Sequence, residues 1–117
     1  MDAFKVKTID KGYSKNEFQI VVNESNGNEH SLLIDIRYWF DEQIESFDSG
    51  FGTIYETIKE LKYKIEKSTI EFIESTDKDG NEIVPVLRQS DIEKIILVID
   101  ESFVNDYAQK LIYEEND

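Results

Sequence analysis

The sequence predicts an α+β fold in which an antiparallel sheet, a three-strand meander plus a hairpin, packs against two helices in the order βββ-α-ββ-α. Three observations support this fold class. Apolar and polar residues alternate through the first 40 residues, which is typical of half-buried strands. Two later segments carry apolar residues at helical spacing. Between these segments, a turn-like stretch separates two further apolar runs.

The chain has 117 residues, of which 39% are hydrophobic and 12% aromatic, and this is enough for one packed core. We therefore expect a single compact α+β domain over residues 1–113, with residues 114–117 forming a frayed acidic C-terminus. The longest uninterrupted apolar run, residues 95–99, is far shorter than the roughly 20 residues of a membrane span. A cytoplasmic protein is the simplest interpretation, and membrane binding is not expected.

The antiparallel meander is expected within residues 4–40. The apolar residues that recur at every second position are Phe4, Val6, Phe18, Ile20, Val22, Leu32, Ile34, Ile36, Tyr38 and Phe40. Residues 11–14 and 26–28 form the turns between the strands, because an Asn-Gly pair such as Asn26-Gly27 tolerates the positive φ of tight hairpins.

Residues 41–52 are expected to form an acidic loop, and residues 53–67 a helix. Thr53 and Glu56 have the spacing of a capping box, in which two side chains bond to free backbone N–H groups at a helix start. The apolar residues that then follow at helical spacing are Ile54, Ile58, Leu61 and Ile65.

A second hairpin is predicted from the apolar segments 69–76 and 82–88. Pro85 cannot donate a ladder hydrogen bond, so the returning strand should lie at an edge or a bulge. The intervening residues 77–81 are rich in oxygen ligands, but both registers of a calcium-binding loop place wrong residues at the required positions. We therefore interpret residues 77–81 as the hairpin turn.

A long C-terminal helix is predicted over residues 91–113. Ser90 and Glu93 form a second capping box. The apolar residues of its three-four repeat are Ile92, Ile95, Ile96, Ile99, Phe103, Tyr107 and Leu111. Residues 95–99 could alternatively form a buried strand, but the persistence of the repeat favours the helix.

The composition excludes several kinds of catalytic site. There is no cysteine, so disulfides, thiolate metal sites and cysteine nucleophiles are absent. The only histidine, His30, follows a turn, and we expect it on the surface and not as a general base. Asp48, Glu60 and Lys62 have the order of a metal-dependent nuclease site, but a helix would place Glu60 and Lys62 about 200° apart. We expect no catalytic residue, no metal site and no cofactor, and hence no enzyme.

The charge of the chain favours a basic protein partner. The 26 acidic and 13 basic residues give a formal net charge of −13 at pH 7, which repels nucleic acids and anionic membranes. Complementary potentials accelerate encounter with a basic surface. The charge is also uneven, because residues 41–52 hold four acidic and no basic residues, residues 91–117 hold eight acidic against two basic, and residues 53–67 carry +1.

We therefore expect a non-enzymatic acidic protein-binding module. It would be an inhibitor or immunity-type protein that blocks the basic, nucleic-acid-binding face of a partner such as a nuclease or toxin. Toxin immunity and mobile-element inhibition by nucleic-acid mimicry fit equally well. The expected partner-binding residues are the anchors Trp39 and Phe47, the acidic Asp41, Glu42, Glu45 and Asp48, and a second acidic row, Asp100, Glu101 and Asp106.

Two questions stay open from the sequence. Trp39 and Phe47 are either presented to a partner or packed into a small core beneath the acidic loop. The alternative function is a small structural or assembly protein, which self-associates through a sheet edge or through the C-terminal helix. A homodimer of this kind would bury Leu97 and Val98, which lie off the apolar stripe of that helix.

Overall fold

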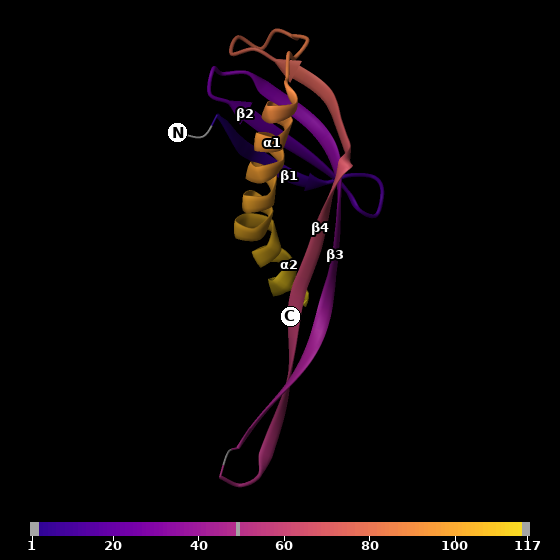
Figure 1. The fold of residues 1–117 in the computed structure, drawn as a ribbon, viewed down its shortest axis with the longest axis vertical. Coiled ribbons are helices and arrows are strands. Elements are labelled where there is room, and N and C mark those ends of the chain that lie inside the picture. The colour runs from indigo at the N-terminus through magenta and orange to yellow at the C-terminus, as the bar shows by residue number, and fades with distance from the viewer. Residues whose placement is uncertain (1–2, 49, 116–117) are drawn as a thin grey trace.

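The computed structural model describes residues 3–48 and 50–115, and for residues 45, 47, 56, 58 and 115 it describes the backbone alone. Its elements are the strands β1 (Phe4–Lys11), β2 (Glu17–Glu24), β3 (Glu29–Asp48) and β4 (Thr53–Thr76), and the helical segments α1 (Gln89–Ser102), η1 (Phe103–Tyr107) and α2 (Ala108–Glu115). The strands form one antiparallel sheet in the order β1-β2-β3-β4 (Figure 1). The three helical segments form one continuous helix. The sheet and this helix confirm the α+β class, but four strands precede a single helix, in place of the predicted order βββ-α-ββ-α with two helices.

The expected meander is confirmed in β1, β2 and the first half of β3. Apolar side chains at alternate positions of β2 and β3 are buried on one face of the sheet: Phe18, Ile20, Val22, Leu32, Ile34 and Ile36. Gly27 has a φ of 96° in the β2–β3 turn, where its N–H donates to the carbonyl oxygen of Glu24 over 2.9 Å. The turn that Asn26-Gly27 predicts is therefore present.

The expected acidic loop over residues 41–52 and the expected helix over residues 53–67 are both wrong. Residues 41–48 continue β3, and they pair with the first part of β4 from Asp41↔Glu60 to Asp48↔Thr53. The connecting turn contains Gly50 and Gly52, whose φ values of 85° and 134° favour glycine. The result is a long two-stranded ribbon, residues 37–66, which we call the arm (Figure 1).

The physical reason is that residues 53–67 satisfy two periodicities at once. Leu61 and Ile65 belong to the helical stripe, but Leu61, Tyr63 and Ile65 also alternate at the spacing of a strand. The segment is rich in isoleucine, tyrosine and threonine, which favour strands. Pairing with residues 41–48 decides the conformation, so Thr53 and Glu56 cap no helix.

A bulge in β4 marks the base of the arm. From Leu33↔Glu71 to Asp35↔Glu66, β3 advances by two residues while β4 advances by five. The Thr69 hydroxyl holds the bulge: it accepts from the N–H of Asp35 over 2.8 Å and donates to the carbonyl oxygen of Glu66 over 2.6 Å. Extra residues of this kind bend a strand and increase its twist.

Of the second expected hairpin, the first strand and the turn are present, but the returning strand is not. Residues 69–76 complete β4, but residues 82–88 form no strand, and Glu82 makes only an isolated bridge to Thr76. The turn over residues 77–81 is confirmed, because Asp77 Oδ1 accepts from the N–H groups of Asp79 and Asn81, each over 2.9 Å. These backbone hydrogen bonds, led by that from Asn81, lower the pKa of Asp77.

The C-terminal helix is confirmed, including its helical conformation over residues 95–99. Its start differs from the prediction, because Asp91, and not Glu93, accepts the N–H of the N-cap residue Arg88, over 2.9 Å. The helix continues to Glu115, beyond the expected frayed end at residue 114. No helix in the described part of the chain is long and apolar enough to cross a membrane.

A π-helical turn, η1, keeps the aromatic residues of the helix on the sheet. Ile99, Phe103, Tyr107 and Leu111 recur every four residues, so on a regular helix the stripe would drift by about 40° per step. The wider turn of η1 rotates less per residue and compensates for this drift. Phe103 and Tyr107 consequently both face the sheet, and their rings stack with centroids 5.6 Å apart.

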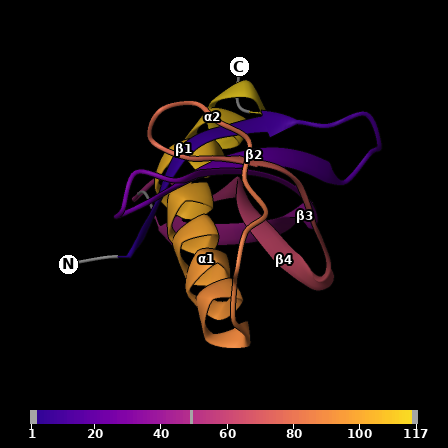
Figure 2. The ribbon, with the colours of Figure 1, turned by 90° about the horizontal axis from the view of Figure 1, so that it is seen from above.

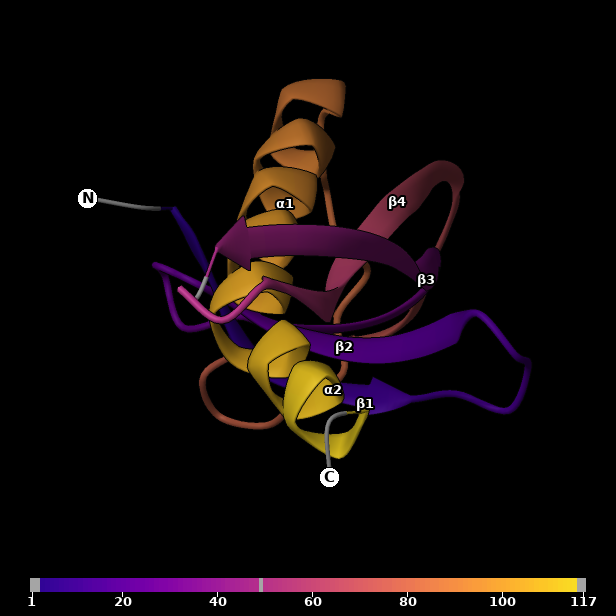
Figure 3. The same cartoon turned by 90° about the horizontal axis from the view of Figure 1, so that it is seen from below.

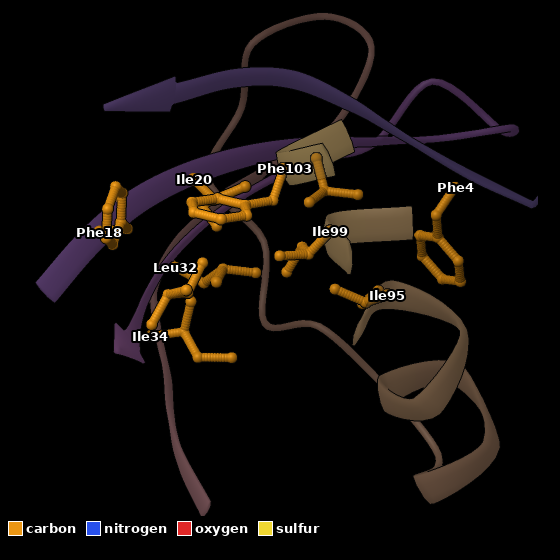
Figure 4. Close-up of a cluster of buried hydrophobic side chains, with 10 residues drawn as sticks. Phe4, Phe18, Ile20, Leu32, Ile34, Ile95, Ile99 and Phe103 are labelled. Carbon is orange, nitrogen blue, oxygen red and sulfur yellow. The ribbon is translucent and has the colours of Figure 1, made fainter. Parts of the chain in front are cut away.

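The core lies between this helix and one face of the sheet (Figures 2 and 3). Figure 4 shows Ile95, Ile99 and Phe103 of the helix among the side chains of the first three strands. Phe103 is fully buried, and its ring meets the ring of Phe18 edge-on at 5.9 Å. The core also fixes the base of the arm, since Tyr63 of β4 packs against Phe103, with ring centroids 4.9 Å apart.

Candidate protein-binding arm

The outer part of the arm extends beyond the helix. The protein measures 67 × 32 × 25 Å along its principal axes, and Figure 1 shows the arm continuing past the end of α2. Leu61 is still half-buried against the core, but every described side chain of residues 41–57 is exposed. We call residues 41–58 the distal arm.

The distal arm combines acidic and apolar residues. Its five acidic residues, Asp41, Glu42, Glu45, Asp48 and Glu56, are accompanied by no basic residue. Its described large apolar side chains are exposed, with relative accessibilities of 73% for Ile44, 101% for Phe51, 44% for Ile54 and 71% for Tyr55. An isolated two-stranded ribbon is at best marginally stable in water, and clustered exposed apolar residues are typical of interaction sites.

The predicted partner-binding residues of the arm differ in how the structure describes their side chains. Trp39 is 45% exposed, so it is not packed into a small core beneath residues 41–52. Asp41, Glu42 and Asp48 are exposed on the arm, as expected. The side chains of Glu45 and Phe47 lie outside the described part of the chain.

The second acidic row does not join the arm as one surface. Asp100 is half-buried and accepts a hydrogen bond from the Tyr63 hydroxyl, so it has a structural contact within the core. Glu101 and Asp106 are exposed on the helix, and Asp106 lies beside β1, around the same pocket as Lys7 and Ile9. We therefore keep the acidic residues of the distal arm as the candidate site.

Several cross-strand pairs of the arm place like charges opposite each other. Asp41 lies opposite Glu60, and Arg37 lies opposite Lys64. Directly opposed like charges destabilise a sheet. Glu42, in contrast, lies opposite Lys59. Lys62 Nζ also lies 3.0 Å from Glu60 Oε1, two positions along the same strand. The charges of the arm therefore include both repulsive and attractive pairs.

The residues with the order of a nuclease site do not converge. The argument from a helix was wrong, because Glu60 and Lys62 share one face of β4 and form an ion pair. However, Asp48 pairs with Thr53, seven positions along β3 from the Asp41↔Glu60 pair. At strand spacing this separation is roughly 23 Å, so Asp48 and Glu60 cannot hold one metal ion.

His30 is buried, which corrects the expectation of a surface residue. Its ring is 1% exposed and bridges Glu24 and Ser75. A carboxylate only accepts hydrogen bonds, so Nε2–H donates to Glu24 Oε1 over 2.9 Å, and Nδ1 faces Ser75 Oγ at 2.7 Å. The signal was present in the sequence, because His30 continues the buried alternation of Leu32 and Ile34.

The Glu24-His30-Ser75 cluster has the residue types of a hydrolase triad but no access for a substrate. Ser75 is only 3% exposed, and the imidazole is flanked by the rings of Phe4 and Phe72, with centroids 6.5 and 6.3 Å away. The cluster instead joins β2, β3 and β4. Among the described residues, no group of three or more His, Asp or Glu side chains is placed to hold a metal ion.

Tyr63 and Asp100 fasten the base of the arm to the helix. Burial, together with the hydrogen bond to Asp100 and the negative charge of Asp100, raises the pKa of Tyr63 from 10.0 to about 12. Deprotonation of the tyrosine would remove the donor and place two negative charges side by side.

We expect the free energy of unfolding to fall as the pH rises from about 10 to about 12, and to fall less in Tyr63→Phe. Between these pH values the unfolded chain releases the tyrosine proton while the folded chain retains it, so alkaline pH favours unfolding. Urea denaturation of both proteins at increasing pH measures the effect. The difference between their free energies of unfolding at each pH removes the contribution of lysines and other tyrosines. Parallel pH profiles would contradict the prediction.

Comparison of the chain with protein-family models, with curated proteins and with solved structures gave no match. The function is therefore inferred from the geometry and charge of the arm alone.

Proposed function

We propose that this protein is a non-enzymatic acidic protein-binding module, whose distal arm blocks the basic, nucleic-acid-binding face of a partner such as a nuclease. The observation that carries the proposal is the distal arm itself: five acidic residues, no basic residue and exposed apolar side chains on a ribbon that projects from the body. An inhibitor in a toxin-immunity pair and a mobile-element inhibitor both fit this surface.

The chemistry of the distal arm suits a basic cleft. Phosphate-binding faces present clustered lysine and arginine side chains, which attract carboxylates in place of phosphates. Acidic residues lie on both faces of the ribbon, because the neighbouring residues Asp41 and Glu42 point to opposite sides. Trp39, Ile44 and Tyr55 would supply apolar contacts at the centre of the interface.

The proposal is tested with an arm variant and a charge-matched control. The arm variant carries Asp41→Asn, Glu42→Gln, Glu45→Gln and Asp48→Asn. The control carries Glu71→Gln, Glu74→Gln, Asp79→Asn and Glu82→Gln, which neutralise four exposed acidic residues outside the arm. Both variants thus lose the same amount of charge.

We expect the wild-type protein, immobilised in an extract of its host, to retain a basic nucleic-acid-binding protein at low salt. On the purified partner, the association rate constant should fall at least about tenfold for the arm variant and change little for the control. The wild type, but not the arm variant, should inhibit the partner's activity on nucleic acid. Equal rate constants for the two variants, or a captured partner without a basic face, would contradict the proposal.

The alternative is a structural or assembly protein that self-associates, and one observation favours it. Leu97 is 67% exposed beside a groove of about 570 Å³ between α1 and the β4 bulge, to which Ile70 and Ile92 contribute. Val98, in contrast, packs half-buried against the core. A dimer through the helix would cover Leu97, and sedimentation showing a monomer at all concentrations would contradict it.

A further inference from the structure

The outer edge of β3 has no neighbouring strand along the arm. The pairing of β2 with β3 ends at Glu17↔Asp35, and the N–H of Ile36 still donates to the carbonyl oxygen of Asn16 over 2.8 Å. Beyond this point, none of the described strands lies beside β3 on that side (Figure 1). The arm therefore presents an open strand edge.

The bond of Ile36 fixes which backbone groups this edge presents. Successive residues of a strand direct their N–H and C=O groups to alternate sides. The register of β3 with β4 is regular from Asp35 to Asp48, so the alternation is unbroken. The N–H and C=O groups of residues 38, 40, 42 and 44 consequently point to the open edge, and those of residues 39, 41 and 43 point to β4.

The sheet ends in β1 and β4, and the open edge of β3 along the arm is a further outer edge, which differs from that of β1 in how it is protected. β1 contains a register shift between Val6 and Thr8, and it carries Lys5, Lys7 and Lys11. Bulges and lysines are common means of preventing edge-to-edge association. Residues 38–48 of β3 contain no bulge, no proline and no basic residue. Acidic residues alone protect this edge.

Acidic residues select among the strands that could pair with this edge. A second copy of the arm would bring its own acidic residues against Asp41 and Glu42, and like charges across a strand pair are destabilising. A strand with basic residues would instead place an opposite charge beside Asp41 on one face of the ribbon or beside Glu42 on the other. Self-pairing is thus disfavoured while pairing with a basic strand is favoured.

We propose that residues 38–44 of β3 bind an extended basic segment of a protein partner by strand addition. The segment would extend the sheet of the arm, with main-chain hydrogen bonds supplying affinity and the acidic side chains supplying selectivity. This inference rests on the proposed function, since it specifies how the acidic arm engages its partner.

The probe is an eight-residue peptide of alternating lysine and valine, blocked at both ends. A matched control is the same peptide with N-methyl groups on alternate residues, which keeps the charge and removes donors from one edge. On binding the first peptide, the amides of Phe40, Glu42 and Ile44 should gain protection from hydrogen exchange, while those of Trp39 and Asp41 should change little. The methylated peptide should bind at least about tenfold more weakly, because strand hydrogen bonds are lost.

A pair of variants tests the same edge from the side of the protein. The N–H of Ile44 faces the open edge, so Ile44→Pro removes an edge donor without removing a β3–β4 bond, whereas Ile44→Ala keeps the donor and shortens the side chain. We expect the proline variant to bind the unmethylated peptide at least about tenfold more weakly than the alanine variant.

Some outcomes would overturn the inference and leave the proposed function intact. Equal binding of the two peptides to the wild-type protein would show attraction by charge alone, and absence of binding would also refute strand addition. Both results are obtained on the wild-type protein, so they do not depend on the folding of the proline variant. The proposed function fails separately, if the arm variant and the charge-matched control associate with the partner at equal rates.

Discussion

Replacing Phe103 by alanine is expected to lower the free energy of unfolding by about 3–5 kcal/mol. Phe103 is fully buried, and its ring lies against the rings of Phe18, Tyr63 and Tyr107 at centroid distances of 5.9, 4.9 and 5.6 Å. It therefore joins the helix both to the sheet and to the base of the arm. Removing the ring loses its transfer free energy and leaves a cavity that the rigid sheet cannot close.

Urea denaturation followed by far-ultraviolet circular dichroism measures this loss. Leu97→Ala is the matched control, because Leu97 lies on the same helix but is 67% exposed, and we expect a change within about 0.5 kcal/mol. Small domains have total stabilities of about 5–15 kcal/mol, so the Phe103 variant would lose a large part of its stability. Similar losses in the two variants would contradict the described packing of the helix.

Replacing His30 by alanine is expected to lower the free energy of unfolding by about 2–4 kcal/mol. The substitution removes a ring enclosed by Phe4 and Phe72 and breaks the hydrogen bonds of that ring to Ser75 and to Glu24, of which Glu24 keeps a bond from Asn26. The loss of buried contacts and the loss of hydrogen bonds act in the same direction. The hydrogen bonds by which His30 joins β3 to β2 and to β4 are thereby lost.

The companion variant Ser75→Ala separates the hydrogen bond from the packing. It removes one bond of His30 and little volume, so we expect a loss of about 1 kcal/mol in the same urea titration. A surface histidine would give losses near zero in both variants. That result would contradict the burial of His30 and restore the expectation drawn from the sequence.

The parts of the fold that sequence reasoning predicted correctly share a simple local pattern. In the meander, Phe18, Ile20 and Val22 alternate strictly and are buried, and the Asn26-Gly27 pair marks a real turn. In the C-terminal helix, the repeat from Ile92 to Leu111 is long enough to exclude a strand at residues 95–99. In each of these elements the apolar residues match only one periodicity, either that of a strand or that of a helix.

The arm was not predicted, because the apolar residues of its two strands do not follow a single periodicity. Ile54 and Ile58 fit a helix, while Leu61, Tyr63 and Ile65 fit a strand equally well. The acidic residues of 41–48 resemble a solvated loop when taken alone. They form a strand because a partner strand lies beside them, and that partner is fixed by the turn around Gly50 and Gly52.

The candidate site was predicted in part for the same reason. Trp39, Asp41, Glu42 and Asp48 are exposed on the arm, as their polar surroundings indicate. Asp100 carries a carboxylate like Asp41 and Asp48, but it accepts a hydrogen bond from the hydroxyl of Tyr63, which lies 37 positions away in the sequence. Composition and spacing do not reveal a contact over such a distance.

Local periodicity and charge were enough to predict the α+β class, the meander, the C-terminal helix and the acidic character of the surface. The projecting ribbon of residues 41–67, and the enclosure of His30 with Ser75 from 45 positions away, became apparent from the structure. Both depend on pairing between distant segments, whose free energy overrides local preference. That pairing also creates the open acidic strand edge on which the inferred binding mode depends.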